Sequence, residues 1–268
     1  MQITFPGLGL NLHISKIAFT IFNIEIYWYA IFIVVSIIIS LIILKIKDGM
    51  LKINFYQIVD LFIYLIPISF IFARLYYVIF NINYYKNNIN NILNIRDGGL
   101  AIYGGLIGGI ITCLIYCKKK KINILDLTDY IVPCLALSQS IGRWGNFTNI
   151  EAYGTTTNLP WRMGIIENNI LKEVHPTFLY ESIITFTLFI ILSKINKKRN
   201  FKGETTIYYL IVYSFARFFI EELRIDSLML YNVKISQLLS AIIFVVSCFT
   251  LSKIIKKCKS NKQKEKKC

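Results

Sequence analysis

Long apolar runs separated by short polar connections make up most of this chain. Each run approaches or exceeds the roughly 20 residues that a helix needs to cross a bilayer. Three runs contain no charged residue, and the other four carry ionisable side chains inside the run or near one end. The runs lie at residues 26–44, 55–80, 98–117, 124–143, 175–193, 203–223 and 235–252. The pattern predicts an all-α polytopic membrane protein, a bundle of seven transmembrane helices.

The composition supports a membrane protein and excludes an ordinary soluble domain. Apolar residues make up 55% of the chain and charged residues 17%, and the mean hydropathy is +0.55. No internal repeat divides the runs, so we expect a single membrane domain over residues 1–255. An outer loop is predicted at about 146–174, where glycines and a proline indicate short strands or turns rather than a separate domain. A basic cytoplasmic tail is predicted at 256–268.

The placement of basic residues predicts the orientation of the helices. Lysine and arginine gather after the first, third, fifth and seventh runs, which places these connections on the cytoplasmic side. The N-terminus is therefore expected outside and the C-terminus in the cytoplasm. The net charge of +15 fits a basic tail beside an anionic inner leaflet, and we expect no nucleic-acid partner. The six cysteines lack metal-ligand spacing, so no metal site is predicted.

A polar segment at residues 142–154 interrupts the apolar pattern at the end of the fourth run. It contains Arg143, Asn146, Asn149 and Glu151 among several glycines. A charge at a membrane boundary is retained when it pairs with another group or binds a ligand, so this segment is a candidate site. The two asparagines could instead cap the helix end or form turns.

Further polar side chains gather in the outer half of the predicted bundle. Arg217 lies well inside the sixth predicted helix, while His175 and Glu181 lie in the outer part of the fifth. Guanidinium groups suit an anionic lipid headgroup, because their planar fork donates two parallel hydrogen bonds to phosphate. A structural alternative stays open, since Arg217, Glu221 and Arg224 share one helix face and could neutralise one another.

Three other features have both a structural and a functional interpretation. The glycine run at 98–109 places small residues where another helix can approach closely, and the same surface could open a groove for an acyl chain. Arg74, near the outer end of the second run, could join the polar set or act as an interfacial anchor. Tyr29 beside Trp28 is typical of an aromatic belt at the membrane boundary.

The segment from Gly142 to Gly154 resembles the signature of the prolipoprotein diacylglyceryl transferase family, and every fixed position of that signature is filled. The segments 98–109, 175–181 and 213–224 are also similar to that family, so the resemblance spans most of the chain. It implies a seven-helix enzyme of the bacterial cytoplasmic (inner) membrane, with its active site toward the outer leaflet. Such an enzyme transfers the diacylglyceryl group of phosphatidylglycerol to the lipobox cysteine of prolipoproteins, forming a thioether and releasing glycerol phosphate. No cofactor or metal is implied.

The resemblance also implies roles for individual residues. Arg143 would bind the phosphate of phosphatidylglycerol, Arg217 would hold it from a facing helix, and Asn146 with Glu151 would order the headgroup side. Some relatives carry a histidine where this chain has Tyr103, so the proton acceptor stays open among Glu151, His175 and Tyr103. The other positions assigned to substrate binding are Asn149, Tyr29, Gly98, Gly99, Gly104, Tyr213 and Glu181.

The implied reaction makes two demands that arginines can meet. The cysteine must react as a thiolate, and the leaving phosphate must not carry an uncompensated charge. A positive potential from Arg143 and Arg217 would stabilise the phosphate and lower the pKa of the thiol.

Two other classes of protein remain open on sequence grounds. A membrane transporter for an anionic substrate would also place arginines among broken helices, although its polar path should continue to the inner face. A purely structural or lipid-binding membrane protein is the third class, and product formation would exclude it.

Overall fold

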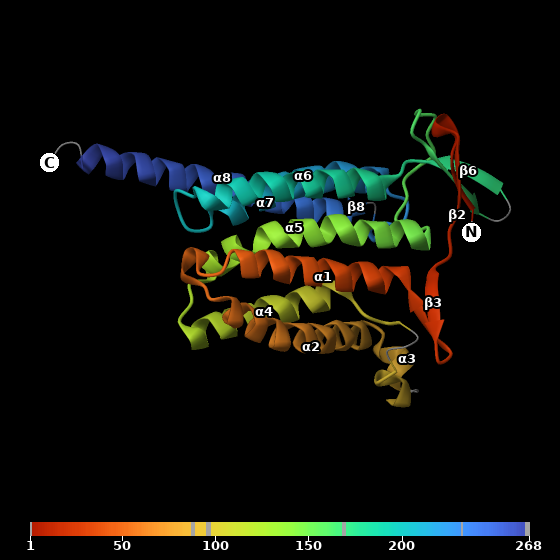
Figure 1. The fold of residues 1–268 in the computed structure, drawn as a ribbon, viewed down its shortest axis with the longest axis horizontal. Coiled ribbons are helices and arrows are strands. Elements are labelled where there is room, and N and C mark those ends of the chain that lie inside the picture. Colours follow the sequence, from red (N-terminus) through yellow and green to blue (C-terminus); the bar gives the residue numbers. More distant parts are fainter. Residues whose placement is uncertain (1, 87–88, 95–97, 168–169, 232, 266–268) are drawn as a thin grey trace. The chain divides into compact units, whose positions relative to one another are not determined.

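The computed structural model describes all residues except 1, 87–88, 95–97, 168–169, 232 and 266–268, and it is mostly helical (Figure 1). The chain divides into two compact units. The first unit consists of Met1–Leu44 and Ile131–Cys268, and the second of Lys45–Tyr130.

A long helix overlaps each predicted apolar run. These are α1 (Trp28–Ile46), α2 (Phe55–Phe80), α4 (Ile102–Lys120), α5 (Ile124–Asn149), α6 (Thr177–Lys197), α7 (Glu204–Leu223) and α8 (Ile235–Glu265). Within the described residues, α1, α2, α4, α6 and α8 are long and apolar enough to cross a membrane. These five helices fit a polytopic membrane protein.

α5 and α7 have 26 and 20 residues but are less apolar than the other long helices. Their polar residues are largely buried inside the protein. Examples are Asp129 and Ser140 on α5 and Glu204 and Glu221 on α7. A helix that contributes polar groups to the protein interior has a lower hydropathy than one that faces lipid all round. The crossing of the membrane by α5 and α7 stays a prediction.

α5 is longer than the predicted fourth helix, and this moves the start of the following loop. The prediction ended the helix at Arg143, whereas α5 continues to Asn149. Arg143, Asn146 and Asn149 therefore lie on one helix at intervals of three residues and share one of its faces. The loop predicted at 146–174 begins instead at Ile150.

Two other helices begin later than predicted, for local reasons. α6 begins at Thr177 rather than at residue 175, because a residue before proline avoids the helical conformation and Pro176 takes the N-cap position. α4 begins at Ile102 rather than at residue 98, because Gly98 and Gly99 have positive φ angles of 86° and 80°.

The all-α prediction is wrong for the connections, which contain β-structure. An antiparallel sheet has the strand order β2-β1-β5-β6, and two separate hairpins pair β3 with β4 and β7 with β8. The strands are β1 (Gln2–Phe5), β2 (Leu10–His13), β3 (Ile17–Ile21), β4 (Ile24–Tyr27), β5 (Met163–Glu167), β6 (Ile170–Val174), β7 (Met229–Leu230) and β8 (Val233–Lys234). Short helices complete the connections at η1 (Pro6–Leu8), η2 (Met50–Lys52), α3 (Ile82–Lys86) and η3 (Ile89–Ile92).

The first and last long helices have different bounds from those predicted. α1 begins at Trp28, two residues later than predicted, because residues 24–27 form β4. α8 continues beyond the predicted end at residue 252 to Glu265, so most of the predicted tail is helical.

One face of the four-stranded sheet packs on the ends of α5 and α6. Ile3 and Ile165 are almost fully buried there, against Phe147 of α5 and Phe178 of α6. The two phenylalanine rings stack with their centroids 4.7 Å apart. This apolar cluster holds the end of α5, with its polar segment, against the start of α6.

In the second unit, glycines allow α2 and α4 to approach closely. A Cβ atom on Gly104 would overlap the main chain of α2 at Phe72 and Ala73, and one on Gly108 would overlap the Phe72 side chain. By contrast, a Cβ on Gly105 would lie 3.7 Å from its nearest neighbour, an ordinary van der Waals distance. The packing interpretation of the glycine run therefore holds for Gly104 and Gly108.

We predict that Gly104→Ala destabilises the protein by about 1–3 kcal/mol, because the added methyl group overpacks the contact with α2. Gly105→Ala is the matched control on the same helix turn. It should leave stability unchanged or raise it by up to about 1 kcal/mol, because alanine favours a helix over glycine. Thermal unfolding of both variants in detergent measures the difference, and equal midpoints would contradict the prediction.

Candidate functional site

A buried carboxylate joins three helices of the first unit. Glu181 of α6 is 2% exposed. Its Oε1 atom lies 2.5 Å from Nη2 of Arg143 on α5, and its Oε2 atom lies 2.9 Å from Nη1 of Arg217 on α7. The Tyr213 hydroxyl also donates to Oε1, at 3.0 Å. Arg217 Nη2 lies 2.5 Å from Oε2 of Glu221 one turn further along α7, so two arginines are matched by two glutamates.

The network continues from Arg143 along the polar face of α5. Arg143 Nη1 donates to Oδ1 of Asn146 at 3.1 Å, and Asn146 Nδ2 donates to Oε1 of Glu151 at 2.8 Å. Asn149 Nδ2 lies 3.4 Å from the same Glu151 oxygen. Glu151 is exposed, whereas Glu181 is buried. The network therefore runs from the interior of the helix bundle to an accessible carboxylate.

An unusual backbone turn places Glu151 beside the end of α5. Ile150 and Ala152 have positive φ angles of 52° and 58°, a conformation that a β-branched residue such as isoleucine rarely adopts. Two hydrogen bonds hold the turn: the Glu151 amide donates to the Asn146 carbonyl at 3.0 Å, and the Thr177 hydroxyl donates to the Ala152 carbonyl. Strained turns of this kind persist where the surrounding structure over-determines them.

Two glycines of the polar segment are required by close contacts. A Cβ on Gly145 would overlap the ring of Tyr29, which therefore packs directly on α5. A Cβ on Gly154 would overlap His175 and lie 3.2 Å from the carbonyl of Leu223. Gly154 also donates to the His175 carbonyl at 2.9 Å. The segment thus ends between the start of α6 and the end of α7.

His175 belongs to a separate group of hydrogen bonds. Its Nδ1 atom lies 3.2 Å from the Tyr180 hydroxyl, which accepts a hydrogen bond from Trp161 Nε1 at 2.8 Å. Since the indole can only donate, the Tyr180 proton is free to point at Nδ1. Burial lowers the pKa of His175 below its ordinary value, so the neutral ring is favoured near pH 7.

Arg224 has a different partner from the one considered in the sequence. Arg217 does pair with Glu221, as the structural alternative supposed, but Arg224 pairs with Asp226 at 2.8 and 2.9 Å. Arg217 has Glu181 as a second partner. A mutual neutralisation of Arg217, Glu221 and Arg224 is therefore wrong for Arg224.

Tyr209 and Gln139 support the network, and the sequence did not identify them as candidates. The Tyr209 ring stacks on Tyr213 with centroids 5.4 Å apart, and its hydroxyl donates to Oε1 of Gln139 at 3.0 Å. Tyr209 lies one helix turn before Tyr213 on α7, so the helical spacing was the available signal. The pair orients the tyrosine that donates to Glu181.

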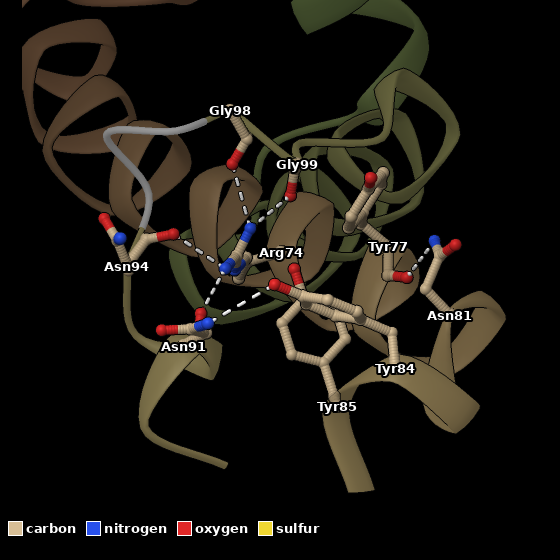
Figure 2. A pocket seen from close by; sticks show the side chains of 9 residues that line it. All are labelled: Arg74, Tyr77, Asn81, Tyr84, Tyr85, Asn91, Asn94, Gly98 and Gly99. Atoms are coloured by element: carbon tan, nitrogen blue, oxygen red, sulfur yellow. Dashed lines mark hydrogen bonds between the residues drawn. The ribbon is translucent and has the colours of Figure 1, made fainter. Parts of the chain in front are cut away.

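Arg74 organises the loop before α4 in the second unit (Figure 2). Its side chain donates five hydrogen bonds of 2.7–2.9 Å, all to main-chain carbonyls. The acceptors belong to Asn91, Ile92, Asn94, Gly98 and Gly99. A guanidinium carries five N–H donors, so every donor of Arg74 is used. Arg74 thus serves neither as a simple interfacial anchor nor as a free phosphate ligand.

The other candidate residues of the second unit are Gly98, Gly99 and Tyr103, and they lie in two different places. Gly98 and Gly99 line a cavity of about 360 Å³ beside Arg74. Tyr103 is half-buried on the first turn of α4, next to Gly104 in the contact with α2. The substrate-binding roles of these glycines and the proton-acceptor role of Tyr103 stay predictions.

The network in the first unit has the chemistry of an anion-binding site. The Arg143 and Arg217 side chains are 19% and 15% exposed, and each guanidinium has N–H donors beyond those that contact Glu181, Asn146 and Glu221. Two cations approach each other here because one buried carboxylate lies between them. Among the described residues, no group of three or more His, Cys, Asp or Glu residues could hold a metal ion.

Comparisons with known proteins agree with the family signature. The family model described as prolipoprotein diacylglyceryl transferase matches residues 16–252. A relative from Finegoldia magna is 45% identical over 232 residues, covering 86% of this chain and 92% of the relative. One from Clostridioides difficile is 43% identical over 251 residues, covering 94% and 100%, and one from Listeria monocytogenes is 41% identical over 242 residues, covering 87% of each. All three are called phosphatidylglycerol–prolipoprotein diacylglyceryl transferase.

We predict that Glu181→Gln destabilises the protein by about 3–5 kcal/mol, because it leaves two half-buried arginines without their shared, buried counter-charge. Glu173→Gln is the matched control: it breaks the partly exposed pair with Arg162, whose loss should cost less than about 1 kcal/mol. Thermal unfolding in detergent compares them. A Glu181→Gln variant as stable as the control would show that the bridge contributes little.

The stability of the protein should depend on the protonation state of His175. The folded pKa of His175 is lower than the unfolded value, so its contribution to stability is full above the unfolded pKa of about 6.5 and is lost as the pH falls below it. We expect the thermal midpoint to drop between pH 7.5 and 5.5, and the drop to be smaller in His175→Gln. Parallel pH dependences of the wild-type protein and the variant would contradict this expectation.

Proposed function

We propose, since this chain belongs to the prolipoprotein diacylglyceryl transferase family, that it transfers the diacylglyceryl group of phosphatidylglycerol to the lipobox cysteine of prolipoproteins. The transfer forms a thioether and releases glycerol phosphate. The observation that carries the proposal is the meeting of Arg143 and Arg217, from two different helices, at one buried carboxylate.

In the proposed reaction, the thiolate sulfur attacks the glyceryl carbon that carries the phosphate. A carbon–sulfur bond forms while the carbon–oxygen bond breaks, and the electron pair of that bond leaves with the phosphate. Negative charge therefore grows on the phosphate oxygens in the transition state. Fixed guanidinium donors at that position stabilise the charge without having to reorganise, which supports a catalytic role for Arg143 and Arg217.

Glu181 has an indirect role in this proposal. Its carboxylate accepts from both arginines and from Tyr213, so it holds the two guanidinium groups in place before the lipid arrives. Tyr213 acts through Glu181 in the same way. Both residues then shape the phosphate site without touching the phosphate.

Among the three candidate proton acceptors, the geometry favours Glu151. Its Oε1 atom is held by Asn146 and Asn149, and its side chain is exposed and therefore accessible to an incoming thiol. The Nδ1 atom of His175 already contacts Tyr180. A role for Asn146 and Asn149 in orienting Glu151 follows from the same contacts.

We place the enzyme in the bacterial cytoplasmic membrane with seven spanning helices, the N-terminus outside and the active site toward the outer leaflet. Lysines in the last turns of α1, α4 and α6 support this orientation. The single membrane domain would cover residues 1–255. Its partners are phosphatidylglycerol, prolipoprotein signal peptides with a lipobox cysteine, and the surrounding lipids.

The structure does not decide against the transporter alternative. An apolar cluster of Val132, Ala136, Leu188, Leu192 and Tyr209 lies between α5, α6 and α7. Polar contacts cross between the same helices, from Ser140 to Ser182 and from Tyr209 to Gln139. Product formation in the transfer assay decides between the two functions.

We predict that Arg143→Ala lowers the rate of diacylglyceryl transfer by about 100- to 1,000-fold, because a charged donor to the developing phosphate is lost. The assay combines purified protein, phosphatidylglycerol and a lipobox-cysteine peptide, and follows the mass of the peptide together with the release of glycerol phosphate. A peptide with Cys→Ser should gain no mass.

Arg162→Ala is the matched control, since Arg162 pairs with a glutamate outside the network. It should keep near-native turnover. Near-native turnover of folded Arg143→Ala would contradict the role of Arg143. A folded wild-type protein that binds the lipid but forms no product would contradict the proposed function itself.

A further inference from the structure

The hairpin of β3 and β4 has one apolar face and one polar face. Its cross-strand pairs are Phe19 with Ile26, Thr20 with Glu25, and Ile21 with Ile24. Because successive residues of a strand point to opposite sides, the first and third pairs share a face and the second pair lies on the other. The Tyr27 hydroxyl donates to Glu25 at 2.8 Å on the polar face.

Most of the apolar face is uncovered by the described part of the chain, although Ile26 is partly buried. Phe19 is 50% exposed, and Ile21 and Ile24 are 49% and 60% exposed. At the tip, Phe22 is 96% exposed and has a positive φ angle of 45°, which the tight turn imposes. A contiguous group of large apolar side chains of this kind marks a surface that contacts a partner or a membrane.

The position of the hairpin identifies the partner. β4 ends at Tyr27, and α1, a candidate membrane span, begins at the next residue (Figure 1). The amide of Trp28 donates to the carbonyl of Lys16 at 3.1 Å, which fastens the base of the hairpin to the first turn of α1. Trp28 and Tyr29 are exposed, as expected of an aromatic belt at the lipid boundary. The hairpin is therefore continuous with the lipid-facing surface of α1.

We propose that the apolar face of the β3–β4 hairpin lies on the outer lipid leaflet, and that the polar face with Thr20 and Glu25 faces water. The inference rests on the proposed orientation, with the N-terminus outside. In this arrangement the hairpin holds the start of α1 at a fixed depth. Tyr29, whose ring packs on Gly145 two residues from Arg143, is held at that depth too. The hairpin thus sets the height of the candidate site relative to the phospholipid headgroups.

Neighbouring residues on opposite faces of β3 give a matched test. Phe19, Thr20 and Ile21 are replaced, one at a time, by the photoreactive residue p-benzoylphenylalanine in the full-length protein. Each variant is reconstituted in phosphatidylglycerol-containing nanodiscs and irradiated, and adducts are identified by mass spectrometry. We expect lipid adducts at positions 19 and 21, with at least a fivefold lower yield at position 20.

Equal lipid yields at all three positions, or no lipid adduct at any, would overturn the inference. Cross-links at 19 and 21 to a second copy of the chain or to an added lipobox peptide, in place of lipid, would also overturn it. Transfer activity is measured on the same samples. Alternating adducts without transfer would argue against the proposed function alone, and transfer without alternating adducts against the hairpin inference alone.

Discussion

The structure of the first unit depends on one buried ionic bridge, the carboxylate of Glu181 between Arg143 and Arg217. A carboxylate that is 2% exposed, in a protein this apolar, is stable only with cationic partners, and each arginine needs the carboxylate for the same reason. The bridge therefore fixes the rotation of α5, α6 and α7 about their own axes. Apolar packing alone would specify that rotation far less sharply, since many apolar contacts are interchangeable.

Other features of the unit maintain the geometry of this bridge. The four-stranded sheet covers Phe147 and Phe178 and so keeps the ends of α5 and α6 together. The left-handed turn at Ile150 and Ala152 returns the chain toward α5, which brings Glu151 into contact with the asparagines. Gly154 allows the same segment to pass close to the end of α7. A site for an anionic lipid can be built in an apolar bundle because its charges balance before the ligand arrives.

Much of the helical framework could be predicted, because runs of about 20 apolar residues leave little choice of structure in a membrane. The α2 range matches its prediction, and the other long helices differ mainly at their ends. Short strands are predicted only for the outer loop, where β5 and β6 lie, and the other strands could not be predicted. β1 pairs with β5 across more than 150 residues, and the Ile24–Tyr27 segment continues an apolar run that predicts a helix. Similarly, sequence identified Arg143, Arg217 and Glu181 as candidates but gave no indication that one glutamate joins both arginines.

The ionic bridge also has a consequence for the biogenesis of the protein. Glu181 lies 38 residues after Arg143, and Arg217 lies 36 residues after Glu181, so the three charges leave the ribosome one after another. Arg143 lies near the end of α5, where an unpaired arginine costs less than the roughly 2.5–3.5 kcal/mol that insertion scales give for the centre of a membrane helix. If α5 crosses the membrane as proposed, it would be inserted with a charge whose carboxylate partner follows later in the chain, on α6. The bridge would then favour the integration of α5, α6 and α7 as a group.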